Sequence, residues 1–142
     1  FLFSLLASVL ALSSCENGDS ELTIDQLIVG TWSLGSVTVD GNDVTSEFSG
    51  FSMTISDGGN YTVNNGGTIL TGGTYFLNSF GTVTTQSSMD LSESSGLASY
   101  NAQAVMSNGN NTLTLSFFNP TTTFGSGRME GLAGDYVFVL NK

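Results

Sequence analysis

The chain has 142 residues, with 12 acidic and 2 basic side chains, no histidine and a net charge of −10. One domain is expected at this length, and the two cations, Arg128 and Lys142, exclude a basic surface for nucleic acid or anionic lipid. The 39% of hydrophobic and 11% of aromatic residues fall in alternating runs, which favours a folded body over disorder.

The first 14 residues predict a signal peptide that lacks its own beginning. Phe1–Leu12 is an apolar run, too short for the roughly 20 residues of a transmembrane helix but typical of a secretory signal. No methionine or basic leader precedes it, so we expect the sequence to begin inside the signal. Leu12-Ser13-Ser14-Cys15 resembles the lipobox of bacterial lipoproteins. The resemblance implies cleavage before Cys15 and an anchor of several acyl chains, because a single chain is marginal.

Residues 15–22 predict a lipidated cysteine followed by a flexible acidic tether. An ordinary buried cysteine fits less well, because a core strand or helix is not usually followed at once by such a polar stretch. The acidic residues of the stretch resemble the export signals of Bacteroidetes-type surface lipoproteins: Glu16, Asp19 and Glu21. We therefore expect an outer-membrane lipoprotein whose domain, residues 23–142, faces the cell surface or the periplasm.

The domain is predicted to start with a short helix and to continue in strands. Thr23 and Gln26 have the spacing of a capping box, and Gly30 soon ends the helix. Beyond it, apolar and polar residues alternate with the period of a strand, with a bulge near Gly35. The predicted strands are 32–39, 51–55, 61–63, 68–70, 74–77, 83–91, 100–106, 113–117 and 136–140.

Tight turns rich in Gly, Asn and Asp join these strands, and longer loops are expected at 92–99 and 119–134. The last strand, Tyr136–Leu140, is apolar on both faces and is predicted to be buried on both sides. This spacing predicts an all-β fold, an antiparallel up-and-down meander barrel of about eight strands. A β-sandwich is the alternative.

Gly30-Thr31-Trp32, at the head of the first strand, resembles the Gly-x-Trp signature of lipocalins and of lipocalin-like domains in bacterial lipoproteins. The resemblance implies that Trp32 packs across the closed end of the barrel with a basic residue over its ring. Lys142, directly after the last strand, matches this position better than Arg128. Arg128 could instead hold an acidic ligand head, as in related fatty-acid-binding barrels, or pair with Glu130 on a loop surface.

The residues of catalysis are scarce. Histidine is absent, Cys15 is expected to carry lipid, and no Gly-x-Ser-x-Gly or nucleotide-binding glycine pattern occurs. Asp90 and Glu93 do not make a persuasive glycosidase pair. The Asp and Asn residues at 40–43 and 57–60 are what ordinary hairpin turns use, although they could hold calcium. We expect no enzyme, no cofactor and no metal.

A set of aromatic residues could line a cup for an apolar ligand: Phe51, Tyr61, Tyr75, Phe76, Tyr100, Phe117 and Tyr136. Small residues among the inward positions leave room for it: Thr85, Ser87, Ala102 and Ala104. The ligand-binding candidates are Tyr61, Tyr75, Tyr100, Phe117 and Arg128. The sequence thus predicts a binder of a small hydrophobic or amphipathic molecule. The alternative is a structural or adhesive cell-surface module with a β-sandwich body and a packed core, and the volume of the interior distinguishes the two.

Overall fold

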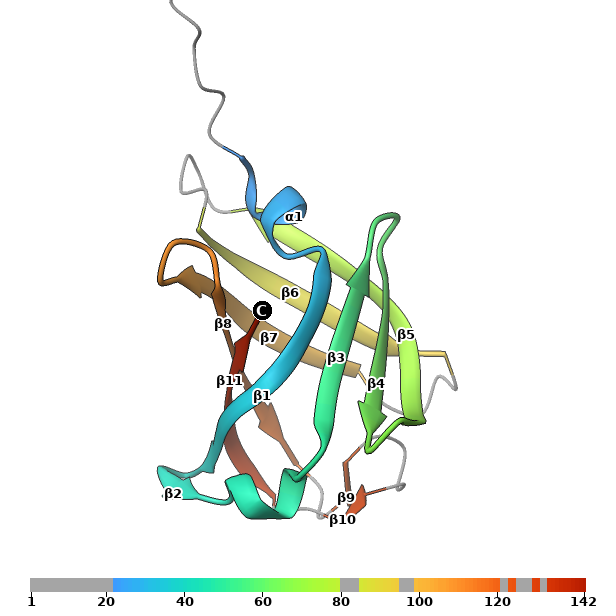
Figure 1. Ribbon diagram of the computed structural model, residues 1–142, viewed down its shortest axis with the longest axis vertical. Coiled ribbons are helices and arrows are strands. Elements are labelled where there is room, and N and C mark those ends of the chain that lie inside the picture. The colour runs from blue at the N-terminus through green and yellow to red at the C-terminus, as the bar shows by residue number, and fades with distance from the viewer. Residues whose placement is uncertain (1–21, 80–84, 95–98, 121–122, 125–128, 131–132) are drawn as a thin grey trace, which may run out of the picture.

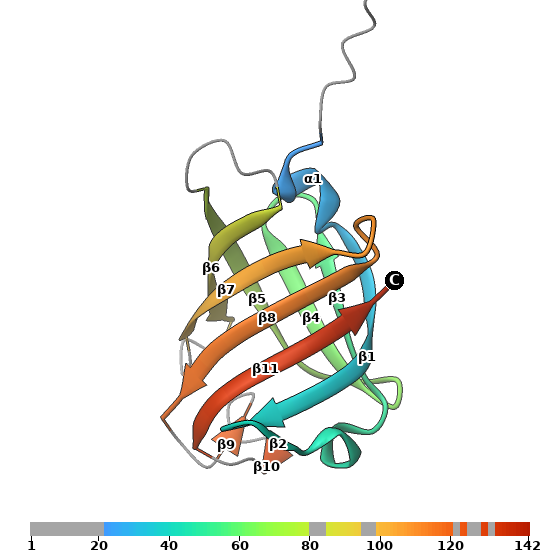
Figure 2. The same ribbon diagram turned by 90° about the vertical axis from the view of Figure 1, so that its left-hand side faces the viewer.

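The computed structural model describes residues 22–79, 85–94, 99–120, 123–124, 129–130 and 133–142. In this part of the chain, eight long antiparallel strands form a closed, lipocalin-like barrel, as the sequence predicts (Figures 1 and 2). They are β1 (Gly30–Val39), β3 (Phe51–Ser56), β4 (Asn60–Asn65), β5 (Thr68–Ser79), β6 (Gln86–Glu93), β7 (Ser99–Ser107), β8 (Thr112–Asn119) and β11 (Gly134–Asn141).

Each of these strands pairs with the next one along the chain, and β11 pairs with β1 to close the barrel. The ten residues of β1 make this closure possible, because its first half pairs with β3 and its second half with β11. The register shifts between Leu34 and Ser36, so the predicted bulge at Gly35 is confirmed. The alternative prediction of a two-sheet β-sandwich is therefore wrong.

Short elements cover the two ends of the barrel (Figures 1 and 2). Helix α1 (Ile24–Leu27) lies at one end, and Gln26 Oε1 accepts the backbone N–H of its N-cap, Thr23, at 3.1 Å. At the other end lie β2 (Asn42–Asp43), the 3₁₀ helix η1 (Thr45–Phe48) and the paired β9 (Thr123–Phe124) and β10 (Met129–Glu130). None of the helices among the described residues has the length and apolar character needed to cross a membrane.

The inward side chains of the strands make one continuous core. In β11, Tyr136, Phe138 and Leu140 are buried, whereas Val137 and Val139 on the outer face are only half-buried. The expectation that both faces of this strand are buried is therefore wrong. The outer face of a barrel strand meets solvent unless another element covers it.

Two predicted boundaries also differ from the structure. Strand β6 begins at Gln86, later than predicted, and it extends to Glu93, so Ser92 belongs to a strand and not to a loop. The predicted loop 119–134 contains β9 and β10. The predicted signal peptide, and the tether except for Leu22, lie outside the described residues.

Candidate functional site

Trp32 and Lys142 close the α1 end of the barrel together. Trp32 is fully buried, and its indole N–H donates to the carbonyl of Ile28 at 2.7 Å. Lys142 Nζ lies 4.6 Å from the centre of the indole ring and donates to the carbonyl of Leu27 at 2.8 Å. The structure thus puts Lys142 in the position that the Gly-x-Trp resemblance implied, and Arg128 lies outside the described residues.

Gly30 is required where this cation passes over the first strand. Its φ is +143°, a region that residues with a side chain rarely adopt. A Cβ atom at this position would come within 2.9 Å of Lys142 Cε. Gly30 and Trp32 therefore act together: the absence of a side chain at Gly30 lets the aliphatic part of Lys142 pass over the strand, and its ammonium group then lies over the indole ring.

The interior of the barrel is nearly filled. A cavity that remains there among the described residues has a volume of about 30 Å³, close to the space of one water molecule. Tyr61, Tyr100 and Phe117 line it, as predicted for a ligand cup, but they pack against their neighbours. Phe117, for example, lies 5.1 Å from Tyr100 and 5.6 Å from Tyr136 between ring centres.

Helix η1 closes the interior at the opposite end. Phe48, which is 1% exposed, makes edge-to-face contacts with Phe51, Tyr136 and Phe138 at 5.3 to 6.3 Å between ring centres. Ala102 and Ala104 are fully buried, so the room that small residues leave is taken by larger neighbours. A ligand of drug size would need these side chains to move.

Glu93 is a buried carboxyl that sequence reasoning left in a loop. It is 5% exposed and lines the small cavity beside Tyr61 and Tyr100. Asp90, three residues earlier on the same strand, is on the opposite face, where its carboxylate accepts from the amides of Asn78 and Asn101. The two carboxyls therefore do not face a common substrate, which agrees with their rejection as a catalytic pair.

The position of Tyr61 predicts a loss of stability at high pH. Burial first, and then the nearby Glu93 and Tyr100, raise the pKa of Tyr61 from 10.0 to about 12. Between pH 10 and pH 12 the unfolded chain releases this proton and the folded chain keeps it, so stability falls as pH rises. By pH 12 this loss is about 2 kcal/mol. Urea unfolding at pH 9 and pH 12 measures it, and Tyr61→Phe should flatten the dependence; equal slopes in both proteins would contradict the assignment.

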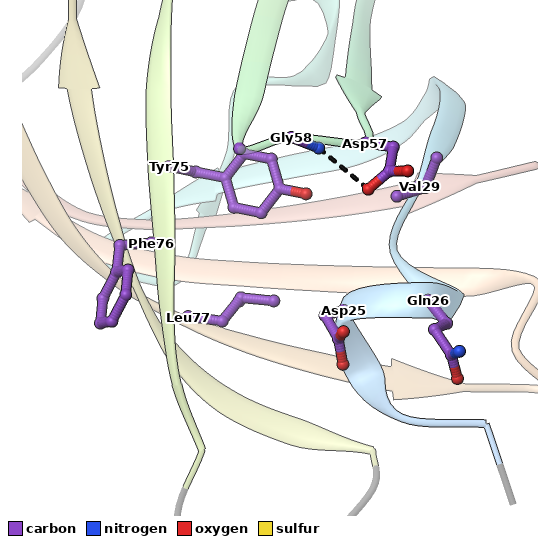
Figure 3. Close-up of a pocket in the computed structure, with 9 residues that line it drawn as sticks. Asp25, Gln26, Val29, Asp57, Gly58, Tyr75, Phe76 and Leu77 are labelled. Carbon is purple, nitrogen blue, oxygen red and sulfur yellow. Dashed lines mark hydrogen bonds between the residues drawn. The ribbon is translucent and has the colours of Figure 1, made fainter.

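A second concave site among the described residues lies outside the packed interior, beside α1. We call it the α1 hollow; its volume is about 660 Å³. Its lining comes from α1 and the residue that follows (Asp25, Gln26 and Val29), the β3–β4 turn (Asp57–Gly59) and β5 (Tyr75–Leu77). Tyr75 and Leu77 point into the space between β5 and α1, and Phe76 lies on the other side of the strand (Figure 3).

The hollow exists because β5 runs past the end of its neighbour. Pairing of β4 with β5 begins at Asn60 and Thr74, and the Tyr75 N–H donates to the carbonyl of Gly59 in the turn at 2.7 Å. Backbone groups alternate sides along a strand, so the N–H and C=O of Leu77 point to the same side as those of Tyr75, beyond the turn. This side of β5 is therefore open toward α1.

The hollow contains two carboxylates and the phenol of Tyr75. The Tyr75 O–H donates to the carbonyl of Ser56 at 3.2 Å. Burial, followed by the charges of Asp57 and Asp25, raises the pKa of Tyr75. Asp57 Oδ1 accepts the N–H of Gly58 at 2.9 Å (Figure 3). The carboxylates of Asp25 and Asp57 are both exposed. The site therefore combines an aromatic ring, apolar side chains and two negative charges.

The structure thus divides the predicted ligand-binding residues between two places. Tyr61, Tyr100 and Phe117 lie inside the packed barrel, Tyr75 lies at the α1 hollow, and Arg128 and Cys15 lie outside the described residues. Phe76 was expected in the inner aromatic set, but it is 65% exposed on the outer face. Sequence reasoning missed that Asp25 and Asp57 line one hollow with Tyr75, because this depends on how far β5 extends beyond the first residue of β4.

Comparisons with known proteins identify no relatives of this chain. No protein-family model, no curated protein and no solved structure matches it.

Proposed function

We propose that this protein is a membrane-anchored lipocalin-like lipoprotein that binds a small amphipathic molecule non-covalently in the α1 hollow. The observation that carries the proposal is the volume of the hollow, about 660 Å³. Binding sites for small molecules have volumes of about 300 to 1,000 Å³, with apolar walls and a few polar groups. The interior cavity, at about 30 Å³, is too small for such a ligand.

The walls of the hollow suit an amphipathic molecule. Val29, Leu77 and the ring of Tyr75 offer apolar surface, and Asp25 and Asp57 offer hydrogen-bond acceptors at its rim. Part of the ligand would thus lie against β5 and α1, out of water, while its polar end meets the carboxylates. This differs from the cup at the barrel mouth expected from the sequence, because η1 and Phe48 fill that end.

The anchor would hold this hollow near the membrane. Cys15 precedes Leu22, the first described residue, by seven positions, which span at most about 25 Å. Leu22 leads directly into α1, the helix that lines the hollow. A lipidated Cys15 therefore keeps the α1 end of the barrel, and its ligand, within reach of the bilayer surface.

A neutral fluorescent probe tests the binding function. We expect N-phenyl-1-naphthylamine to bind the purified protein, and Leu77→Gln to weaken its binding roughly tenfold, which corresponds to about 1.4 kcal/mol. The matched control is Phe118→Gln, which replaces an apolar side chain that is 60% exposed on β8, away from the hollow. Native mass spectrometry should also show a co-purified small molecule. Probe binding that is insensitive to Leu77→Gln would place the site elsewhere.

The packed interior favours a second candidate, a structural or adhesive surface module with a barrel body. Such a module would use its loops and exposed strand edges for a protein or glycan partner. It predicts neither probe binding nor a co-purified molecule. The two experiments above therefore separate the candidates.

A further inference from the structure

We propose that the α1 hollow selects an organic cation with an apolar body, such as an alkylammonium. This inference rests on the proposed binding function and adds the charge of the ligand to it. The placement of two carboxylates around an aromatic ring carries it.

The carboxylates come from separate elements and face the same space. Asp25 belongs to α1, and Asp57 to the β3–β4 turn, and Tyr75 lies between β5 and both of them (Figure 3). The phenol of Tyr75 experiences both charges. An ammonium group in this space would therefore lie in the field of two opposite charges, whereas an anionic head would lie in the field of two like charges.

No basic side chain among the described residues balances these carboxylates in the hollow. The chain has two basic residues; Arg128 is not described, and Lys142 is held by Trp32 and the carbonyl of Leu27. The net charge of −10 acts in the same direction, because it attracts cations to the whole surface. The local charge of the hollow is therefore negative without compensation from its described lining.

The aromatic and apolar lining decides the kind of cation. A cation over a tyrosine ring is attracted by the negative face of the ring, and an alkyl or aryl body gains from burial against Val29 and Leu77. A bare Ca²⁺ ion needs about six to eight oxygen ligands. The described residues contain no group of three or more His, Cys, Asp or Glu side chains that could hold a metal ion, so the hollow suits an organic cation better than an inorganic one.

The test is displacement of N-phenyl-1-naphthylamine by three decyl compounds that differ in their head groups: decyltrimethylammonium, decanol and decyl sulfate, each below its micelle concentration. We expect the cation to displace the probe at a concentration at least tenfold lower than the sulfate. Asp25→Asn/Asp57→Asn should remove most of this preference. Circular dichroism checks that every variant and mixture retains the strand signal.

The matched control is Glu47→Gln/Asp135→Asn, which removes two exposed carboxylates outside the hollow, one on η1 and one at the start of β11. It changes the net charge equally and should keep the preference. A preference that falls equally in both double variants, or survives in both, would overturn the inference. Equal displacement by all three compounds would also overturn it and leave the binding function standing. A probe that never binds would instead remove the proposed function itself.

Discussion

Replacing Trp32 by alanine is expected to lower the free energy of unfolding by about 3 to 5 kcal/mol. The indole is fully buried, so its removal leaves a cavity at the α1 end of the barrel. The change also removes the donor to the carbonyl of Ile28 and the ring under Lys142. The free energy of unfolding of a domain is about 5 to 15 kcal/mol, so this one substitution would remove a large part of the stability.

Urea unfolding followed by circular dichroism measures the effect, because Trp32 is the single tryptophan and its fluorescence disappears with it. Phe118→Ala is the matched control, since Phe118 is 60% exposed and its loss should cost well under 1 kcal/mol. Trp32→Phe should fall between the two, because it keeps a ring and loses the hydrogen bond. A change below about half a kcal/mol in Trp32→Ala would contradict the role of the indole as the plug of the barrel.

The α1 end of the barrel, which Trp32 and Lys142 close, is the part that the sequence predicts best. Gly30 and Trp32 mark the head of β1, and Lys142 follows the last strand at the position that the motif requires. Strand alternation and turn residues likewise predict the order of the barrel strands. These features depend on short-range sequence patterns: the alternation of apolar and polar residues along a strand, and the residue types that favour turns.

Strand β5 shows why some boundaries could not be predicted. The pair Gly72-Gly73 resembles a break before a new strand, yet β5 continues through it from Thr68 to Ser79. A Cβ atom at Gly73 would overlap the backbone carbonyl of Ser92 on β6. The glycine is therefore needed for the close approach of two strands, a requirement that appears only once β5 and β6 are paired.

The ends of the barrel depend on tertiary contacts in the same way. Phe48 lies between two predicted strands with no periodic pattern around it, but η1 carries its ring into the aromatic core. The α1 hollow arises because β5 extends beyond the first residue of β4, and Asp25, Asp57 and Tyr75 all line it. Neither the closure of the barrel by Phe48 nor the α1 hollow can be deduced from one segment, because each is made by elements far apart in the sequence.

Replacing Cys15 by serine is expected to move the protein from the membrane to the soluble fraction. The prediction follows from Leu12-Ser13-Ser14-Cys15, in which the thiol is the expected site of acylation. Each buried methylene contributes about 0.8 kcal/mol to membrane binding, so several acyl chains hold the protein almost completely on the bilayer. A hydroxyl at this position leaves no thiol to acylate.

The measurement is fractionation of cells that express the chain behind a complete export signal, together with labelling by a fatty-acid analogue. Ser14→Ala is the matched control, because alanine keeps a small residue before the cysteine, so the variant should remain on the membrane and carry label. Persistent membrane association of Cys15→Ser would show that something other than an acyl chain holds the protein there. It would also remove the argument that a lipid at Cys15 keeps the α1 hollow near the bilayer. The barrel and its hollow would still be testable with soluble probes, so the anchor and the binding site stand or fall independently.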